Sequence, residues 1–135
     1  MAFNGYLLQV GSYQITGERF INEKSYKATL NIQDLDSYRD ANGVLHRNAL
    51  DHVPAKIEIN TREGLNNFEW AEFMGNIRSN FTVAKERKAI VTAFIPELND
   101  YITQEMYIPD PEVSIDIIQL NIIKYQSIRL AFIGY

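Results

Sequence analysis

Apolar and polar residues alternate in several short stretches of the chain, and this two-residue period is typical of β-strands. Residues 6–10 and 13–15 flank a Gly-Ser dipeptide, which predicts a β-hairpin. Residues 25–32 and 55–60 each place apolar side chains on one face and polar side chains on the other. These two stretches therefore predict strands that are buried on one side.

One segment in the middle of the chain has a different period. Between residues 65 and 81, apolar residues recur at three- and four-residue steps, which is the spacing of one face of a helix. Thr61 or Asn66 is the expected N-cap. Gly75 lies inside this helix and costs up to about 1 kcal/mol relative to alanine. The predicted apolar stripe comprises Leu65, Phe68, Ala71, Phe73, Met74, Ile77 and Phe81, with Trp70 near its edge.

The second half of the chain again favours strands. Residues 89–95 form a nearly continuous apolar run, which predicts a strand buried on both faces. Residues 100–108 favour β-structure, and the Pro-Asp-Pro sequence at 109–111 then breaks the chain. Residues 113–120 and 122–135 predict a final pair of strands around a Leu-Asn turn. The apolar C-terminal residues predict an end that lies in a sheet or an interface.

The predicted elements are about eight or nine short strands and one helix. Helices do not alternate with strands, which disfavours a doubly wound parallel sheet. We expect a mainly β fold, a mostly antiparallel sandwich or barrel with one flanking α-helix. The length of 135 residues indicates a single domain over residues 1–135.

The polar segment 33–47 is the most distinctive part of the sequence. It is dense in charge, it joins two strand-like segments, and its Asn42-Gly43 pair predicts a turn. Residues 44–52 predict a resumed strand. Tyr38 and Leu45 stand among its charges, which indicates contact with another protein. The candidate contacts are Asp36, Tyr38, Arg39, Asp40, His46 and Arg47, with the tyrosine and the two arginines ranked first because interfaces favour these residue types.

Composition narrows the classes of function. The absence of cysteine excludes disulfides, thiolate catalysis and cysteine-based metal sites. No stretch has the composition of a signal peptide or the length of a membrane span. The net charge of −4 disfavours a nucleic-acid binder. The charge is uneven: residues 97–116 hold six acids and no base, and residues 78–88 hold four bases and one acid, so these two blocks would pair within the fold or between copies.

The sequence contains no well-supported metal-binding or catalytic site. The Asp-rich segment from Asp34 lacks the glycine that a calcium loop needs at its sixth position, so a charged turn is the better interpretation. His46 and His52 lack a third zinc ligand at metal spacing. No motif of a hydrolase, kinase or dinucleotide-binding protein occurs. We therefore predict no catalytic residue, metal or cofactor. Phe81, Lys85, Arg87 and Lys88 are the only dense aromatic and basic cluster, and a core role for such aromatics is the more frequent one.

Several stretches resemble a family of small proteins from phages and prophages of Gram-positive bacteria, some of which are described as tail proteins. The resemblance covers essentially the whole chain, and segment 33–47 is its most distinctive part. The stretches that carry it are residues 1–7, 33–47, 99–104, 107–111 and 129–135.

A looser resemblance is architectural. A β-sandwich or barrel with one helix and a long connecting loop is similar to the fold of tail-tube, distal-tail and baseplate hub proteins. The resemblance implies a structural subunit that self-assembles, in a hexameric ring, and contacts neighbouring rings through residues 33–47. It also implies tube, tape-measure or baseplate hub proteins as partners, and a lumen through which DNA passes without specific binding. The implied location is the virion tail, assembled in the host cytoplasm, with no membrane partner.

Two other functions remain open from the sequence. A monomeric tail-assembly chaperone or adaptor would share this composition without self-association. A cell-wall hydrolase module would require a pair of acids that the sequence does not single out.

Overall fold

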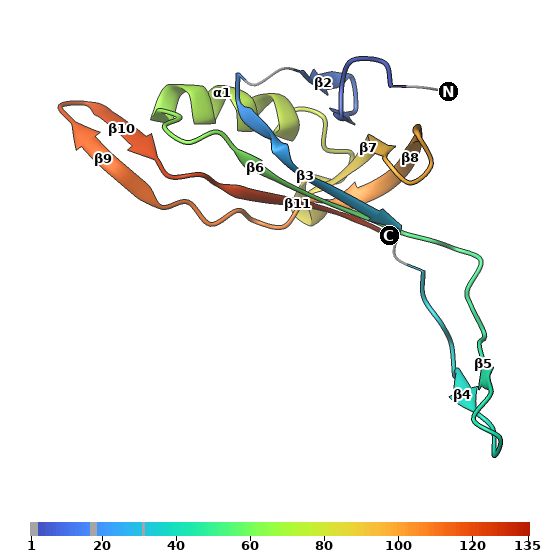
Figure 1. Cartoon of the computed structure of the whole chain (residues 1–135). Coiled ribbons are helices and arrows are strands. Elements are labelled where there is room, and N and C mark those ends of the chain that lie inside the picture. Colours follow the sequence, from blue (N-terminus) through green and yellow to red (C-terminus); the bar gives the residue numbers. More distant parts are fainter. Residues whose placement is uncertain (1–2, 17–18, 31) are drawn as a thin grey trace.

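The structure is a computed structural model that describes residues 3–16, 19–30 and 32–135. Seven strands form one sheet in the order β2-β1-β7-β8-β11-β6-β3, and neighbouring strands run antiparallel (Figure 1). The strands of this sheet are β1 (Leu8–Val10), β2 (Tyr13–Ile15), β3 (Ile21–Leu30), β6 (Ala55–Thr61), β7 (Lys88–Ile95), β8 (Asp100–Tyr107) and β11 (Arg129–Gly134).

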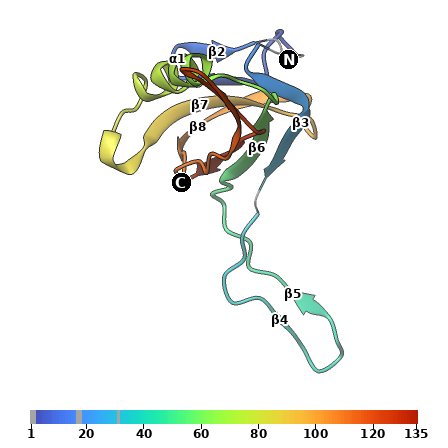
Figure 2. The ribbon, with the colours of Figure 1, turned by 90° about the vertical axis from the view of Figure 1, so that its left-hand side faces the viewer.

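The sheet curls strongly, so that its edge strand β3 approaches β7 on the other half (Figure 2). The Tyr26 hydroxyl on β3 donates a hydrogen bond of 2.6 Å to the carbonyl of Phe94 on β7, and burial raises the pKa of this tyrosine. The sequence did not distinguish between a β-sandwich and a β-barrel. The body is one curled sheet of seven strands, and the described residues confirm the mainly antiparallel β fold with one helix.

Helix α1 (Asn67–Arg78) packs on the concave side of this sheet. Its buried side chains are Phe73, Met74 and Ile77, and they meet the inward residues of β6 and β7. The alternation of β6 is confirmed. The expectation that residues 89–95 are buried on both faces is wrong, because Ile90 is 48% exposed and only alternate residues of β7 are fully buried.

The helix begins with a capping box. The Asn66 side chain accepts a 2.8 Å hydrogen bond from the Glu69 amide, and the Glu69 carboxylate accepts one from the Asn66 amide. Of the two predicted caps, Asn66 is therefore the one used. Thr61 is instead buried in β6, where its hydroxyl accepts a hydrogen bond from the Ile128 amide. The apolar stripe predicted for this helix included too many residues, because Phe68 is 64% exposed.

Substituting Asn66 by alanine is expected to lower the free energy of unfolding by about 1 kcal/mol, because the Glu69 amide loses its acceptor. Asn66→Asp keeps a side-chain acceptor and is expected to stay within about 0.5 kcal/mol of the parent. Urea denaturation of the two variants measures the difference. Equal losses in both variants would show that the capping bond contributes nothing.

Two projections leave the sheet. We call residues 32–53, which connect β3 to β6, the arm; it contains the two-residue strands β4 (Tyr38–Arg39) and β5 (Leu45–His46) and extends well away from the body (Figures 1 and 2). Where the sequence predicted a strand over residues 44–52, the structure has only the two-residue strand β5. Residue 31, at the end of the predicted strand 25–32, lies outside the described residues.

The second projection is the hairpin of β9 (Ile115–Gln119) and β10 (Ile122–Tyr125), which we call the β9–β10 hairpin. The predicted turn at Leu120-Asn121 is confirmed, with Leu120 at a φ of 53°. The predicted strand over 122–135 is divided in two, because the chain leaves the hairpin and enters the main sheet as β11, between β8 and β6.

Candidate functional site

The tip of the arm is a tight turn held by backbone bonds. The Asp40 amide donates to the Val44 carbonyl at 3.0 Å, and the Gly43 amide donates to the Asp40 carbonyl at 2.9 Å. Gly43 has a φ of +81°, a conformation that side chains with a Cβ rarely adopt, and this explains the glycine. The Asn42-Gly43 turn predicted from the sequence is therefore present.

An ion pair joins the two sides of the arm nearer its base. The Arg47 guanidinium donates two hydrogen bonds to the Asp34 carboxylate, at 3.1 and 2.8 Å. Backbone bonds between Leu35 and Asn48 and between Leu50 and Gln33, each 2.8 Å, lie beside it. The arginine holds the pKa of Asp34 below its ordinary value. This two-point geometry fixes the orientation of the two sides more firmly than a single contact would.

A second polar cluster surrounds Asp40. One oxygen of its carboxylate accepts hydrogen bonds from the Asn42 and Val44 amides, and the other lies 2.8 Å from His46 Nε2. The His46 ring stacks on Tyr38 at 5.0 Å between centroids. The bond to His46, followed by the backbone amides, lowers the pKa of the Asp40 carboxyl. Asp40 is thus the residue around which the tip is folded.

The structure brings five of the six predicted contact residues into these internal clusters. Arg39 adds a hydrogen bond of 2.9 Å from its guanidinium to the Gly43 carbonyl. Asp36, the sixth, has a φ of 55° and makes no ion pair within the described part of the chain. The charged residues therefore shape the arm, and their contact with another protein stays a prediction.

Sequence reasoning missed most of the side chains that the arm leaves exposed. Tyr38 is 60% exposed and Val44 is 55% exposed. Leu45 was noted among the charges but was not listed as a contact. The signal was present in the sequence, because aliphatic residues recur throughout an otherwise polar segment. The large apolar residues exposed on the arm are Ile32, Leu35, Tyr38, Val44, Leu45 and Leu50.

The lowered pKa values predict that the arm loosens in acid. Asp34 and Asp40 have folded pKa values below the ordinary one of about 3.9, so their stabilisation is complete above that value and is lost as the pH falls through the lowered values. An NMR titration of the carboxyl carbons is expected to give low midpoints for both. Arg47→Gln should return only the Asp34 midpoint to the ordinary range. Ordinary midpoints in the parent chain would contradict the pairing.

The β9–β10 hairpin is a second apolar projection. Leu120, in its turn, is 99% exposed, and Ile118 is 61% exposed. Ile118 faces Ile123 across the two strands, and Ile117 faces Lys124, so both faces of the hairpin carry isoleucine. The Ile123 amide donates to the Asn67 side chain at the start of α1, which ties the hairpin to the body. The sequence predicted these strands but not their exposure.

The two oppositely charged blocks pair in part within the fold. Lys88 lies 2.7 Å from Glu105, and Arg87 lies 3.3 Å from Asp110. The first contact joins the neighbouring strands β7 and β8. Of the two arrangements left open by the sequence, pairing within one copy therefore applies to Glu105 and Asp110.

The histidines do not come together. His46 contacts Asp40, and His52 contacts the carbonyl oxygen of Tyr135. Within residues 3–16, 19–30 and 32–135, no group of three or more His, Asp or Glu side chains is placed to hold a metal ion. None of the described helical segments is long and apolar enough to cross a bilayer.

Comparison with known proteins identifies the fold and the family. No curated protein matches the sequence. A chain from the tail of an empty gene transfer agent particle with C6 symmetry is similar in structure, with a TM-score of 0.56 and 15% identity over 99% of this chain and 95% of that one. A chain from the virion of a native gene transfer agent particle has a TM-score of 0.51 and 13% identity, over 100% and 94%. At these identities the likeness shows a shared fold.

The family model that matches describes a family of unknown function and covers residues 1–135. The match therefore includes the sheet, the helix, the arm and the β9–β10 hairpin. On this evidence the chain belongs to the DUF6711 family.

Proposed function

We propose that this protein is a structural subunit of a phage-type tail, and that it forms rings in which the arm of each copy contacts a neighbour. The observation that carries the proposal is the arm, which holds six large apolar side chains outside the body of the fold. The shared fold with a chain from a C6-symmetric tail supports a ring of six copies.

The arm exposes several large apolar side chains to water. An apolar centre with a polar rim is typical of an interface. The arm has this composition, because Leu35, Val44 and Leu45 lie beside charged groups. Two polar clusters hold its shape before any partner binds, so less conformational entropy is lost on association.

The six contact residues predicted from the sequence lie on the arm, at or beside the proposed contact. Tyr38 presents its exposed ring to the neighbour, and Asp36 offers a carboxylate that makes no ion pair with the residues that the structure describes. Arg39, Asp40, His46 and Arg47 border these contacts while they hold the arm in shape. A structural role of this kind needs neither a catalytic residue nor a cofactor.

The proposal extends to the position of the subunit in the tail and to its neighbours. We infer a distal-tail, tube or baseplate hub position, with tube, tape-measure or hub proteins as neighbours in the virion tail and with assembly in the host cytoplasm. Acids between residues 97 and 116 that are not paired within the fold would face a lumen, where they would repel the phosphates of passing DNA.

Native mass spectrometry and negative-stain imaging of the purified chain at increasing concentration test the proposal. The expected result is a hexamer in the mass spectrum, with rings or short tubes in the images. A chain that stays monomeric at every concentration would overturn it. Binding of that monomer to tail proteins, together with its absence from mature particles, would identify an assembly chaperone or adaptor instead.

A further inference from the structure

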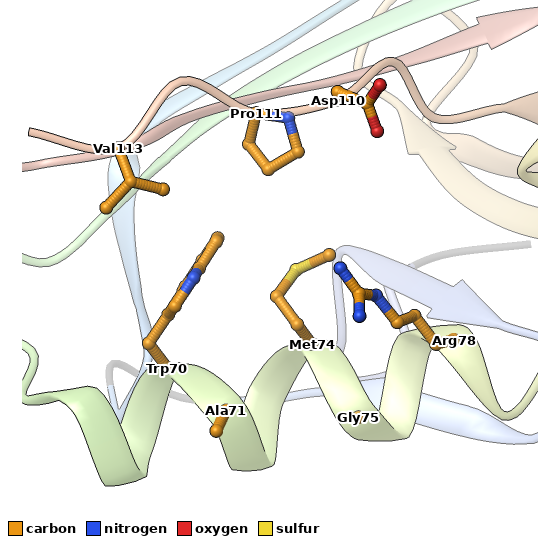
Figure 3. Close-up of a pocket in the computed structure, with 8 residues that line it drawn as sticks. All are labelled: Trp70, Ala71, Met74, Gly75, Arg78, Asp110, Pro111 and Val113. Carbon is orange, nitrogen blue, oxygen red and sulfur yellow. The ribbon is translucent and has the colours of Figure 1, made fainter.

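An open groove of about 410 Å³ lies between α1 and the segment that follows β8 (Figure 3). Trp70, Met74 and Arg78 stand on successive turns of the helix; Trp70 and Met74 point towards the opposite wall, and the Arg78 side chain extends along the helix towards Met74. That wall is formed by residues 110–113. In Figure 3 one end of the groove is apolar, between Trp70 and Val113, and the other end holds Arg78 and Asp110.

The wall opposite the helix is held in place by its own chemistry. Two prolines, at 109 and 111, restrict the backbone of this segment. Arg87 donates a hydrogen bond of 2.7 Å from Nε to the Ile108 carbonyl, and its guanidinium lies 3.3 Å from Asp110. The groove is therefore formed before any ligand enters, which favours binding.

Gly75 in the helix is not explained by contacts with the described residues. A glycine inside a helix is less favourable than alanine, and its use elsewhere reflects a positive φ or a close approach of another group. Its φ is not in the positive range, and a Cβ built at this position meets nothing within 4 Å. Because Gly75 borders the groove, the missing side chain leaves room for a group from another molecule.

The arm has the chemistry that this groove accepts. Its apolar side chains match the apolar end, and Asp36 matches Arg78, since neither makes an ion pair within the described residues. The arm cannot fill the groove of its own copy, because it extends from the body on the side away from α1 (Figures 1 and 2). A contact between different surfaces of two copies is of the head-to-tail kind, which closes rings or builds filaments.

We propose that the groove between α1 and residues 110–113 receives the exposed apolar side chains next to the tip of the arm, Val44 and Leu45, from a second copy of this chain. The proposal rests on the proposed function and deepens it by naming the surface that the arm contacts. Val44 and Leu45 enter the apolar end of the groove, and Asp36 lies beside Arg78.

Two substitutions of the same glycine separate docking from folding. Gly75→Ala and Gly75→Leu both replace glycine with a good helix former, so both are expected to keep or raise the Tm of the chain. Leucine adds a large side chain at the border of the groove that Gly75 lines, whereas alanine adds a single methyl group. We expect at least about a 10-fold higher dissociation constant for self-association of Gly75→Leu in analytical ultracentrifugation, with Gly75→Ala close to the parent.

The absence of cysteine permits a direct test of proximity. Chains with Val44→Cys are mixed with chains with Gly75→Cys under mild oxidation, and mixed disulfide dimers are expected. Thr29→Cys, at an exposed position of β3, replaces Val44→Cys in the control and is expected to give few mixed dimers.

The outcomes distinguish this inference from the proposed function. Assembly that is lost on charge substitution in the arm but kept in Gly75→Leu, with no disulfide between positions 44 and 75, would overturn the groove and leave the ring. A parent chain that stays monomeric would overturn both. The mixed disulfide together with weakened Gly75→Leu would support both.

Discussion

Replacing Val44 and Leu45 together by aspartate is expected to yield a folded chain that no longer self-associates. Both side chains are exposed, and neither belongs to the core, so the Tm of the monomer should change little. At an interface, the same change places two unpaired charges in an apolar contact, which is strongly unfavourable. We expect self-association to weaken at least about 100-fold, equivalent to about 2.7 kcal/mol.

The matched control is Leu98→Asp. Leu98 is 51% exposed in the turn between β7 and β8, so the substitution introduces one aspartate, against two in the arm variant, at an apolar surface position outside both projections. Sedimentation velocity and thermal unfolding of the two variants are measured side by side. Equal loss of association in both would show that net charge, and not the arm, governs assembly. Unchanged association in the double variant would refute the arm as a contact.

The parts of the fold with a strict two-residue period were predictable. The alternation of residues 55–60 corresponds to β6, and the hairpin at residues 6–15 corresponds to β1 and β2. A strand with one face on a core must alternate, because a shift of one residue would expose every apolar side chain. The capping box also has a local cause, since Asn66 and Glu69 satisfy each other's amides.

The errors arise where burial depends on distant segments. The run at residues 89–95 is apolar on both faces, but Ile90 is 48% exposed, because the alternate residues of β7 are the ones that face the core. The strand predicted over residues 122–135 was divided because β11 pairs with β6 and β8, and no local pattern encodes that pairing. The spacing of apolar residues along the chain could not predict the exposure of Ile90 or the division of this strand.

The sequence predicted where the arm lies, but it did not predict the hydrogen bonds that its charged residues make within the arm. The charge and turn residues of 33–47 identified the arm, and the Asn42-Gly43 turn is where it was expected. The charged residues were interpreted as contacts with a partner, and this stays a prediction; Arg39, Asp40, His46 and Arg47 also make hydrogen bonds within the arm. Whether a charge is free or paired depends on which residues the hairpin register places opposite it. The register sets Tyr38 opposite His46, and this became clear only in the structure.

Phe73→Ala is expected to cause the largest loss of stability of any single substitution considered for this protein. Phe73 is fully buried on α1, and its ring contacts those of Phe20, Trp70 and Tyr13 at centroid distances of 5.1, 6.2 and 6.4 Å. It thus joins the helix to the N-terminal part of the chain. Removal of the ring leaves a cavity that these neighbours cannot all fill, at a cost of about 3–5 kcal/mol. This is a large share of the roughly 5–15 kcal/mol that stabilises a domain.

Phe68→Ala is the matched control, because it removes the same side chain from the same helix at an exposed position. Its expected effect on the free energy of unfolding is within about 0.5 kcal/mol. Urea denaturation at low protein concentration measures both variants without interference from assembly. The helical spacing placed both phenylalanines in one apolar stripe, so the pair tests the structure against the simpler pattern. Similar losses in the two variants would mean that Phe68 is packed and that the orientation of α1 is wrong; a large loss at Phe73 alone would establish which side of α1 covers the sheet.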